Sequence, residues 1–292
     1  MDELSHYPGS YFDIDYEAND RIDFQDDGDQ GLNVTIDKSY KDNHINIHTS
    51  PFAVNKFSIS NTAVEGQVFE ASISRDQNEN VLELSHVGEL LKGVTSHVFV
   101  SVPQKELKQT DGVATLTLRN HRTNFELKGS TQNNGLLGFS LLHGVKSNLA
   151  VGFELYYKLG QNSGGASVAT RYRGNLINKN HQYQLTSTYN IMGDLSASIS
   201  LGIIPQCLSL STRYNLNTSS MTSTLQIGTQ ILATPKIMDK AIPICLKLKT
   251  DTELNHAVRL EFEAPLFSVS LGSYSNKQSK NFLSNYGIGI HL

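Results

Sequence analysis

The chain is dominated by short segments in which apolar and polar residues alternate. In residues 149–159 every odd-numbered position is apolar, and residues 195–203 repeat the pattern with Ser or Gly at the even positions. Because successive side chains of a strand point to opposite faces of a sheet, such segments predict strands with one apolar and one polar face. Turn residues such as Asn133–Gly135 and Met192–Asp194 separate them.

The length of these segments distinguishes two kinds of β protein. Residues 31–292 contain eighteen or nineteen candidate strands, or about 14 residues for each strand with its turn. A tilted strand needs roughly ten residues to cross a bilayer, whereas strands of soluble sheets most often have about 5–6. We therefore expect an all-β fold: a transmembrane β-barrel of about nineteen strands over residues 31–292, preceded by a short acidic segment, residues 1–30.

Three segments depart from the alternating pattern. Glu89–Lys92 and Pro235–Lys240 are expected to be loops, the second being the longest connection. Residues 11–24 can hold a short helix, although several Asp residues do not favour it.

Charge is unevenly spread along the chain. Residues 1–30 contain ten acidic residues and a single base, Arg21, whereas the remainder holds 18 acids and 23 bases. Such an acidic segment is either a disordered solubilising leader or a docking segment for basic partners. Four aromatic residues lie among the acids and favour docking: Tyr11, Phe12, Tyr16 and Phe24.

The expected location follows from what the sequence lacks. No basic region followed by an apolar stretch opens the chain, so we expect no secretory signal. No apolar run reaches the roughly 20 residues of a membrane helix. Bacterial outer-membrane barrels need a secretory signal to reach their membrane. Because we expect none here, we expect the barrel of an organelle. Cys207 and Cys245 lie in strand-like segments and are expected to be free thiols.

Enzyme chemistry finds no support in the sequence. His44 and His48 share one face of a strand-like segment, but no acidic third ligand lies near them. No nucleophile elbow, phosphate-binding loop or zinc-protease motif occurs. We expect no enzyme, no metal, no cofactor and no nucleic-acid partner.

The polar strand face is expected to line the barrel lumen, because a Lys or Arg facing lipid costs about 2–4 kcal/mol near the bilayer midplane. Both signs of charge occur there, which indicates a hydrated conduit. The simpler interpretation is that these charges only hydrate the wall. The expected lumen residues are Glu154, Lys158, Arg171, Arg173, Arg213, Lys247, Lys249, Arg259, Glu261 and Glu263.

The chain ends in a strand with a distinct motif. Its polar, glycine and hydrophobic positions are Asn285, Gly287, Ile290 and Leu292. Tyr286, Ile288, Ile290 and Leu292 would form one apolar face, and glycines the other. An edge strand of this kind can pair with another strand. The motif resembles the signal by which the mitochondrial sorting machinery recognises barrel precursors.

Three stretches together resemble the mitochondrial-porin superfamily: residues 31–49, Leu149–Tyr157 with Gly165–Tyr172, and Asn285–Leu292. Within it the chain most resembles the central channel of the outer-membrane translocase, although its leader is shorter and more acidic than that of many such channels. The resemblance implies a pore that conducts unfolded precursor proteins with basic presequences. Glu154, Glu261 and Glu263 would be lumen contacts for those precursors.

The same resemblance implies nineteen strands with the first and last in parallel, a homodimer, small single-helix subunits and a receptor subunit. It places the chain in the outer membrane of a mitochondrion or a related organelle. Two alternatives remain open. One is a voltage-dependent anion-selective metabolite channel. The other is a structural barrel that organises assembly or membrane contacts, as in the sorting and assembly machinery.

Overall fold

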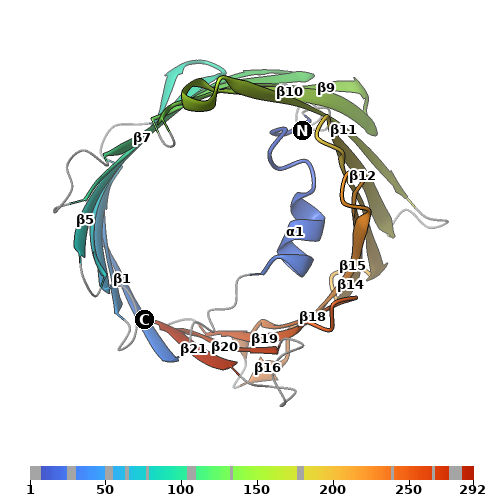
Figure 1. Ribbon diagram of the computed structural model, residues 1–292. Coiled ribbons are helices and arrows are strands. Elements are labelled where there is room, and N and C mark those ends of the chain that lie inside the picture. Colours follow the sequence, from blue (N-terminus) through green and yellow to red (C-terminus); the bar gives the residue numbers. More distant parts are fainter. Residues whose placement is uncertain are drawn as a thin grey trace. The chain divides into compact units, whose positions relative to one another are not determined.

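The computed structural model describes residues 8–24, 31–49, 55–62, 66–76, 79–103, 110–131, 134–175, 181–237, 240–264, 267–275 and 285–292. In these ranges nineteen strands form a single sheet (Figure 1). The first strand, β1 (Gly31–Tyr40), pairs with both β2 (Asn43–Thr49) and the last strand, β21 (Asn285–His291). The sheet therefore has no free edge, and the expected all-β barrel of nineteen strands is confirmed.

The strands belong to two compact units, and β1 and β11 (Ser163–Asn175) each run from one unit into the other. The first unit comprises the described residues up to Tyr11 and within Thr35–Val168. From β2 to β10 each strand pairs antiparallel with the next. Its further elements are β3 (Asn55–Asn61), β4 (Gln67–Asp76), β5 (Glu79–Leu91), β6 (Val94–Pro103), β7 (Asp111–Asn120), β8 (Thr123–Ser130), β9 (Leu136–Lys146), β10 (Leu149–Lys158) and the 3-10 turn η4 (Leu159–Gln161).

The second unit comprises the described residues within Phe12–Val34 and Ala169–Leu292. Its helix α1 (Tyr16–Ile22) lies against β13, β14, β15 and β18. A small two-stranded sheet, β16 with β17, joins β15 to β18. The further strands are β12 (Gln182–Asn190), β13 (Asp194–Ile204), β14 (Leu208–Asn217), β15 (Thr222–Ala233), β16 (Lys236–Ile237), β17 (Lys240–Ala241), β18 (Ile244–Asp251), β19 (His256–Glu263) and β20 (Ser268–Ser275). No helix in the described ranges is long and apolar enough to cross a bilayer.

The two faces of the strands differ as the alternation predicts. In β13, Ser198 and Ser200 are buried while Ile199 between them is exposed. In β10, Val151, Phe153, Leu155 and Tyr157 are exposed on one face, and Glu154 is half-buried on the other. We call the apolar face the lipid face and the polar face, on which α1 lies, the lumen wall.

Two segments expected to be loops are partly strands. Glu89–Leu91 end β5, and a turn follows at Lys92 and Gly93. The connection Pro235–Lys240 contains β16 and the first residue of β17. Both predictions were wrong in part, because Glu89 and Leu91 pair with Thr95 and Val94 and so extend β5, and because β16 and β17 pair with each other within the connection. The short helix expected within residues 11–24 forms at Tyr16–Ile22.

Candidate functional site

The site with the densest contacts is where α1 meets the lumen wall of the second unit. Ile14, Ala18 and Ile22 are spaced four residues apart, so they lie along one face of the helical segment. All three are buried. The wall beneath presents small residues, including Ser200 and Ser211, whose hydroxyls are 2.8 Å apart. Small side chains leave room for a helix to lie directly on the sheet.

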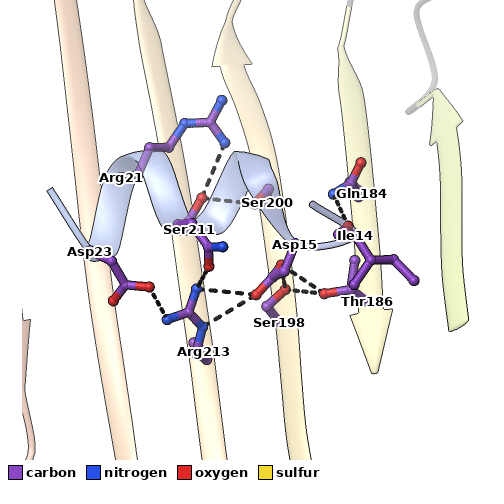
Figure 2. Close-up of polar contacts among 11 residues, drawn as sticks. Ile14, Asp15, Arg21, Asp23, Gln184, Thr186, Ser198, Ser200, Ser211 and Arg213 are labelled. Atoms are coloured by element: carbon purple, nitrogen blue, oxygen red, sulfur yellow. Dashed lines mark hydrogen bonds and ion pairs between the residues drawn. The ribbon is translucent and has the colours of Figure 1, made fainter. Parts of the chain in front are cut away.

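Asp15, which precedes α1, is held by the wall at both carboxylate oxygens (Figure 2). Thr186 Oγ1 donates to its Oδ1 at 2.7 Å, and Ser198 Oγ donates to the same oxygen. Arg213 Nε and Nη2 both donate to Oδ2 at 3.2 Å. Because these contacts use both oxygens, the Asp15 side chain makes no capping hydrogen bond to α1.

Arg213 of β14 connects both ends of the helix to the wall. Besides Asp15, its Nη1 donates to Asp23 Oδ2 at 2.6 Å, and its Nη2 donates to the Asn19 side-chain oxygen. Arg213 is 9% exposed. A guanidinium can serve several acceptors at once because its donors are fixed in a planar fork, which an ammonium lacks.

A third ion pair and the hydrogen bonds of Arg21 also join the helix to the wall. Lys247 Nζ of β18 lies 2.8 Å from Asp20 Oδ1. Arg21, the base on the helix, donates to Ser211 Oγ at 3.1 Å and to Gln230 Oε1 at 3.4 Å. Asp15, Asp20 and Asp23 of the N-terminal segment therefore bind basic residues of the chain's own barrel.

Gly228 of β15 allows the helix to approach. A Cβ built at this position would lie 2.2 Å from the backbone oxygen of Arg21 and 3.0 Å from Ile22 Cγ1. Distances this short are not tolerated between real atoms, so any side chain here would displace α1.

In the first unit, Tyr11 is buried against the wall formed by β10 and β11. Its hydroxyl lies 2.7 Å from Ser167 Oγ. Burial raises the pKa of Tyr11, and the nearby Glu154 carboxylate raises it further, while the Ser167 hydrogen bond opposes the shift. Gly152 leaves space for the ring, because a Cβ there would lie 2.9 Å from Tyr11 Cδ2.

The structure brings together two of the three predicted precursor contacts. Glu261 and Glu263 of β19 line a hollow of about 280 Å³ with Arg259, Cys245 and His291. Arg259 Nε lies 2.7 Å from Glu261 Oε1. The third, Glu154, belongs to the first unit, beside Tyr11.

The predicted C-terminal motif lies in β21 and in Leu292, which follows it. Gly287 and Gly289 are buried, whereas Ile288 and Leu292 are exposed. Gly287 pairs with Gly272 of β20, and Ile290 pairs with Val269. The side chain of Asn285 lies outside the described part of the structure.

These groups can hold charge but supply no recognisable catalytic set. Among the described residues no cluster of three or more His, Cys, Asp or Glu could hold a metal ion. The lumen wall of β12–β18 instead presents hydroxyls and cations to carboxylates, which is an anion-binding arrangement. The sequence predicted Arg213 and Lys247 in the lumen. For the acidic segment, however, it predicted basic partners in other proteins and not in this chain.

Nineteen lipid-facing strands with a polar lumen wall define an outer-membrane barrel of the mitochondrial-porin type. Comparison with known families narrows this class. The profile of the mitochondrial distribution and morphology protein 10 family matches residues 95–257, which is more than half of the chain. The chain belongs to this family, and it is a non-enzymatic barrel of the mitochondrial outer membrane.

The matches to individual proteins say less about the chain than the family match does. The mitochondrial distribution and morphology protein 10 of Yarrowia lipolytica is 38% identical over 88 residues, which cover 30% of this chain and 25% of that protein. The chain thus spans a quarter of the length of the curated relative it matches. Among solved structures, the P pilus usher translocation pore PapC covers 84% of this chain and 57% of its own, with 11% identity and a TM-score of 0.35. That likeness is too weak to bear on fold or function.

Family membership corrects the predicted function. The chain is not the precursor-conducting translocase pore, because its matched region belongs to the distribution and morphology family. The expected precursor contacts of Glu154, Glu261 and Glu263, and the expected presequence, single-helix, receptor and homodimer partners, are not tested by this match and stay predictions. The prediction failed because the three stretches that carried it, residues 31–49, 149–172 and 285–292, did not distinguish the translocase channel from the family that matches residues 95–257.

Proposed function

We propose that this chain is a structural barrel that serves mitochondrial distribution and morphology by organising assembly or membrane contacts in the outer membrane. The observation that carries the proposal is the family match over residues 95–257, which span β6 to the start of β19. Most of the sheet lies within the matched region. The proposal takes up the second alternative left open by the sequence, the structural barrel.

The contacts of the N-terminal segment support this function over conduction. Asp15, Asp20 and Asp23 are engaged by Arg213 and Lys247 of the same chain. Carboxylates that already form ion pairs attract a passing basic presequence less than free carboxylates do, because the two interactions compete. The engaged carboxylates therefore favour a structural barrel over a pore that attracts presequences.

Two further assignments belong to the same proposal. Residues 1–30 act as an acidic N-terminal segment, and residues 31–292 form the barrel. Asn285, Gly287, Ile290 and Leu292 act as the sorting signal and closing strand. The alternation of Gly287 and Gly289 with the exposed Ile288 supports this role, because it leaves a flat inner face at the strand that completes the sheet.

Depletion of the protein in its own cells, followed over time, tests the function. A structural barrel predicts that mitochondrial shape and the assembly of other β-barrels deteriorate first, while import of soluble matrix precursors into isolated mitochondria stays normal. Re-expression of the chain should restore both. Loss of matrix import before any change in shape or barrel assembly would contradict the proposal.

A further inference from the structure

The lumen wall beneath α1 has basic residues whose partners come from outside the wall. In the described part of the chain, Arg213 and Lys247 form their ion pairs with Asp15, Asp23 and Asp20. The strands β12–β15 and β18 carry only two carboxylates of their own, Asp194 and Asp251, each at a strand end. Asn217 donates to Asp194, and Asn255 donates to Asp251.

The same wall supplies neutral donors aimed at a carboxylate. Thr186 and Ser198, which are 5% and 3% exposed, both donate to a single oxygen of Asp15. Buried hydroxyls and cations need acceptors, because leaving them unpaired is unfavourable. The wall is therefore built for an anionic occupant, whichever segment supplies it.

The present occupant is weakly structured on its own. The helix α1 has seven residues, and isolated helices of that length are unstable in water because nucleation is costly. Its buried apolar residues are Ala18 and Ile22, and Ile14, which precedes the helix, is buried beside them. Tyr16 on the helix is 65% exposed and Phe12 before it is 77% exposed. Binding thus rests on the burial of Ile14, Ala18 and Ile22, on the carboxylate contacts and on attachment to the barrel.

We propose that the lumen wall of β12–β15 and β18 is a receptor for a short acidic helical peptide, that α1 is its tethered occupant, and that an acidic segment of a partner protein can replace α1. The recognised feature is a strip of apolar residues at a spacing of four, Ile14, Ala18 and Ile22, flanked by carboxylates. A peptide fits better than a lone anion, because the wall contacts three carboxylates as well as the apolar strip. The site would hold a partner whether or not the barrel shapes mitochondria.

Peptide binding to the purified full-length chain tests this assignment. The probe is a fluorescent peptide with the sequence Ser10–Phe24, and the variant carries Asp15→Asn, Asp20→Asn and Asp23→Asn together. A tethered segment competes at a millimolar effective concentration, so weakening it should improve peptide binding about tenfold or more over the wild type. A peptide with the same three Asn residues is the matched control and should not bind.

A second variant tests the wall itself. Adding Arg213→Gln and Lys247→Gln to the triple variant should abolish peptide binding, while circular dichroism and heat-dependent gel mobility show whether the barrel is folded. Equal binding by wild type and triple variant would overturn the proposal. The proposal would also be overturned if trypsin cleaved after Arg21 as slowly in the triple variant as in the wild type. The helix α1 would then be held without its carboxylates.

Changing the lipid shows whether the wall binds an acidic peptide or the phosphate of a lipid headgroup. The measurement is repeated in nanodiscs of phosphatidylcholine with and without phosphatidylglycerol. Peptide binding that is unchanged by phosphatidylglycerol supports the assignment. Loss of peptide binding in its presence would mean that the wall takes a lipid phosphate, and the peptide proposal would fall.

Discussion

At the scale of single residues, Gly228 determines how closely α1 can approach β15. We predict that Gly228→Ala weakens α1 docking by about 1–3 kcal/mol, the usual cost of overpacking. The release should be visible as faster trypsin cleavage after Arg21, the single base of residues 1–30, by about fivefold or more. Mass spectrometry of the released fragment measures the rate.

Gly202→Ala in β13 is the matched control for this experiment. Its added Cβ would lie 3.6 Å from the Gln182 oxygen, which is an ordinary contact. Cleavage after Arg21 should therefore stay at the wild-type rate. Equal rates in both variants would show that α1 does not need the space at Gly228.

Arg213 contributes geometry as well as charge. We predict that Arg213→Lys weakens docking by about 1.5–3 kcal/mol, the range for hydrogen bonds to charged groups, because an ammonium cannot serve Asp15 and Asp23 together. Lys247→Arg is the comparison, since Lys247 pairs with Asp20 through one atom. The same cleavage assay applies, and a larger effect of Lys247→Arg would contradict the bridging role.

At the scale of elements, the two faces of each strand should tolerate charge unequally. Leu127 in β8 lies on the lipid face and lines an apolar hollow of about 650 Å³ on β6–β10. Leu127→Arg should destabilise the barrel by about 2–4 kcal/mol if it lies near the bilayer midplane. Lys128→Arg, one residue on, should have little effect. Denaturant unfolding in vesicles compares them, and equal stabilities would argue against the assigned faces.

The closing strand makes a separate prediction about assembly. Gly287→Leu would place a side chain beside Gly272, at a buried position of β21. We expect it to lower the amount of assembled barrel after import into isolated mitochondria, as read on native gels. Ile288→Leu, on the lipid face, should assemble normally. If Gly287→Leu assembled to the wild-type amount, the terminal motif would be an ordinary strand end with no role in assembly.

The strands were predictable from sequence, but their long-range partners were not. Alternation in residues 149–158 fixed β10, because burial on one face leaves a local pattern. Nothing near Asp15 indicates that it binds Arg213, since the pair is separated by 198 residues. The sequence shows that residues 1–30 are acidic and that the remainder is basic. Only the fold shows which acidic residue binds which basic residue. The family was not predictable either, because features that related barrel families share cannot distinguish one family from another.

At the scale of the whole molecule, the charge of the N-terminal segment should set ion preference. Residues 1–30 carry a net −9 and the remainder a net +5 with His neutral. Deleting residues 1–24 should shift any current through the barrel towards anions, because Arg213 and Lys247 lose their carboxylate partners. Reversal potentials in planar bilayers with a salt gradient measure the shift.

The triple variant with Asp15→Asn, Asp20→Asn and Asp23→Asn should move the reversal potential in the same direction by a smaller amount. Assembly of the shortened chain, residues 25–292, also tests whether the barrel forms without α1. A shift towards cations after the deletion would be incompatible with a basic wall beneath α1.

The pairing of β1 with β21 also has a kinetic consequence. These strands lie at opposite ends of the barrel sequence, so their contact closes the longest loop in the chain and carries the largest entropic cost. In the described sheet the other neighbouring strands follow one another along the chain, with only β16 and β17 between β15 and β18, so they can pair beforehand over short loops. Until the last strand arrives, the nascent sheet has two open edges, each able to template pairing with a foreign strand. We therefore expect this seam to be the slow step of biogenesis, and chains stalled before it to be prone to mispairing with neighbouring barrels.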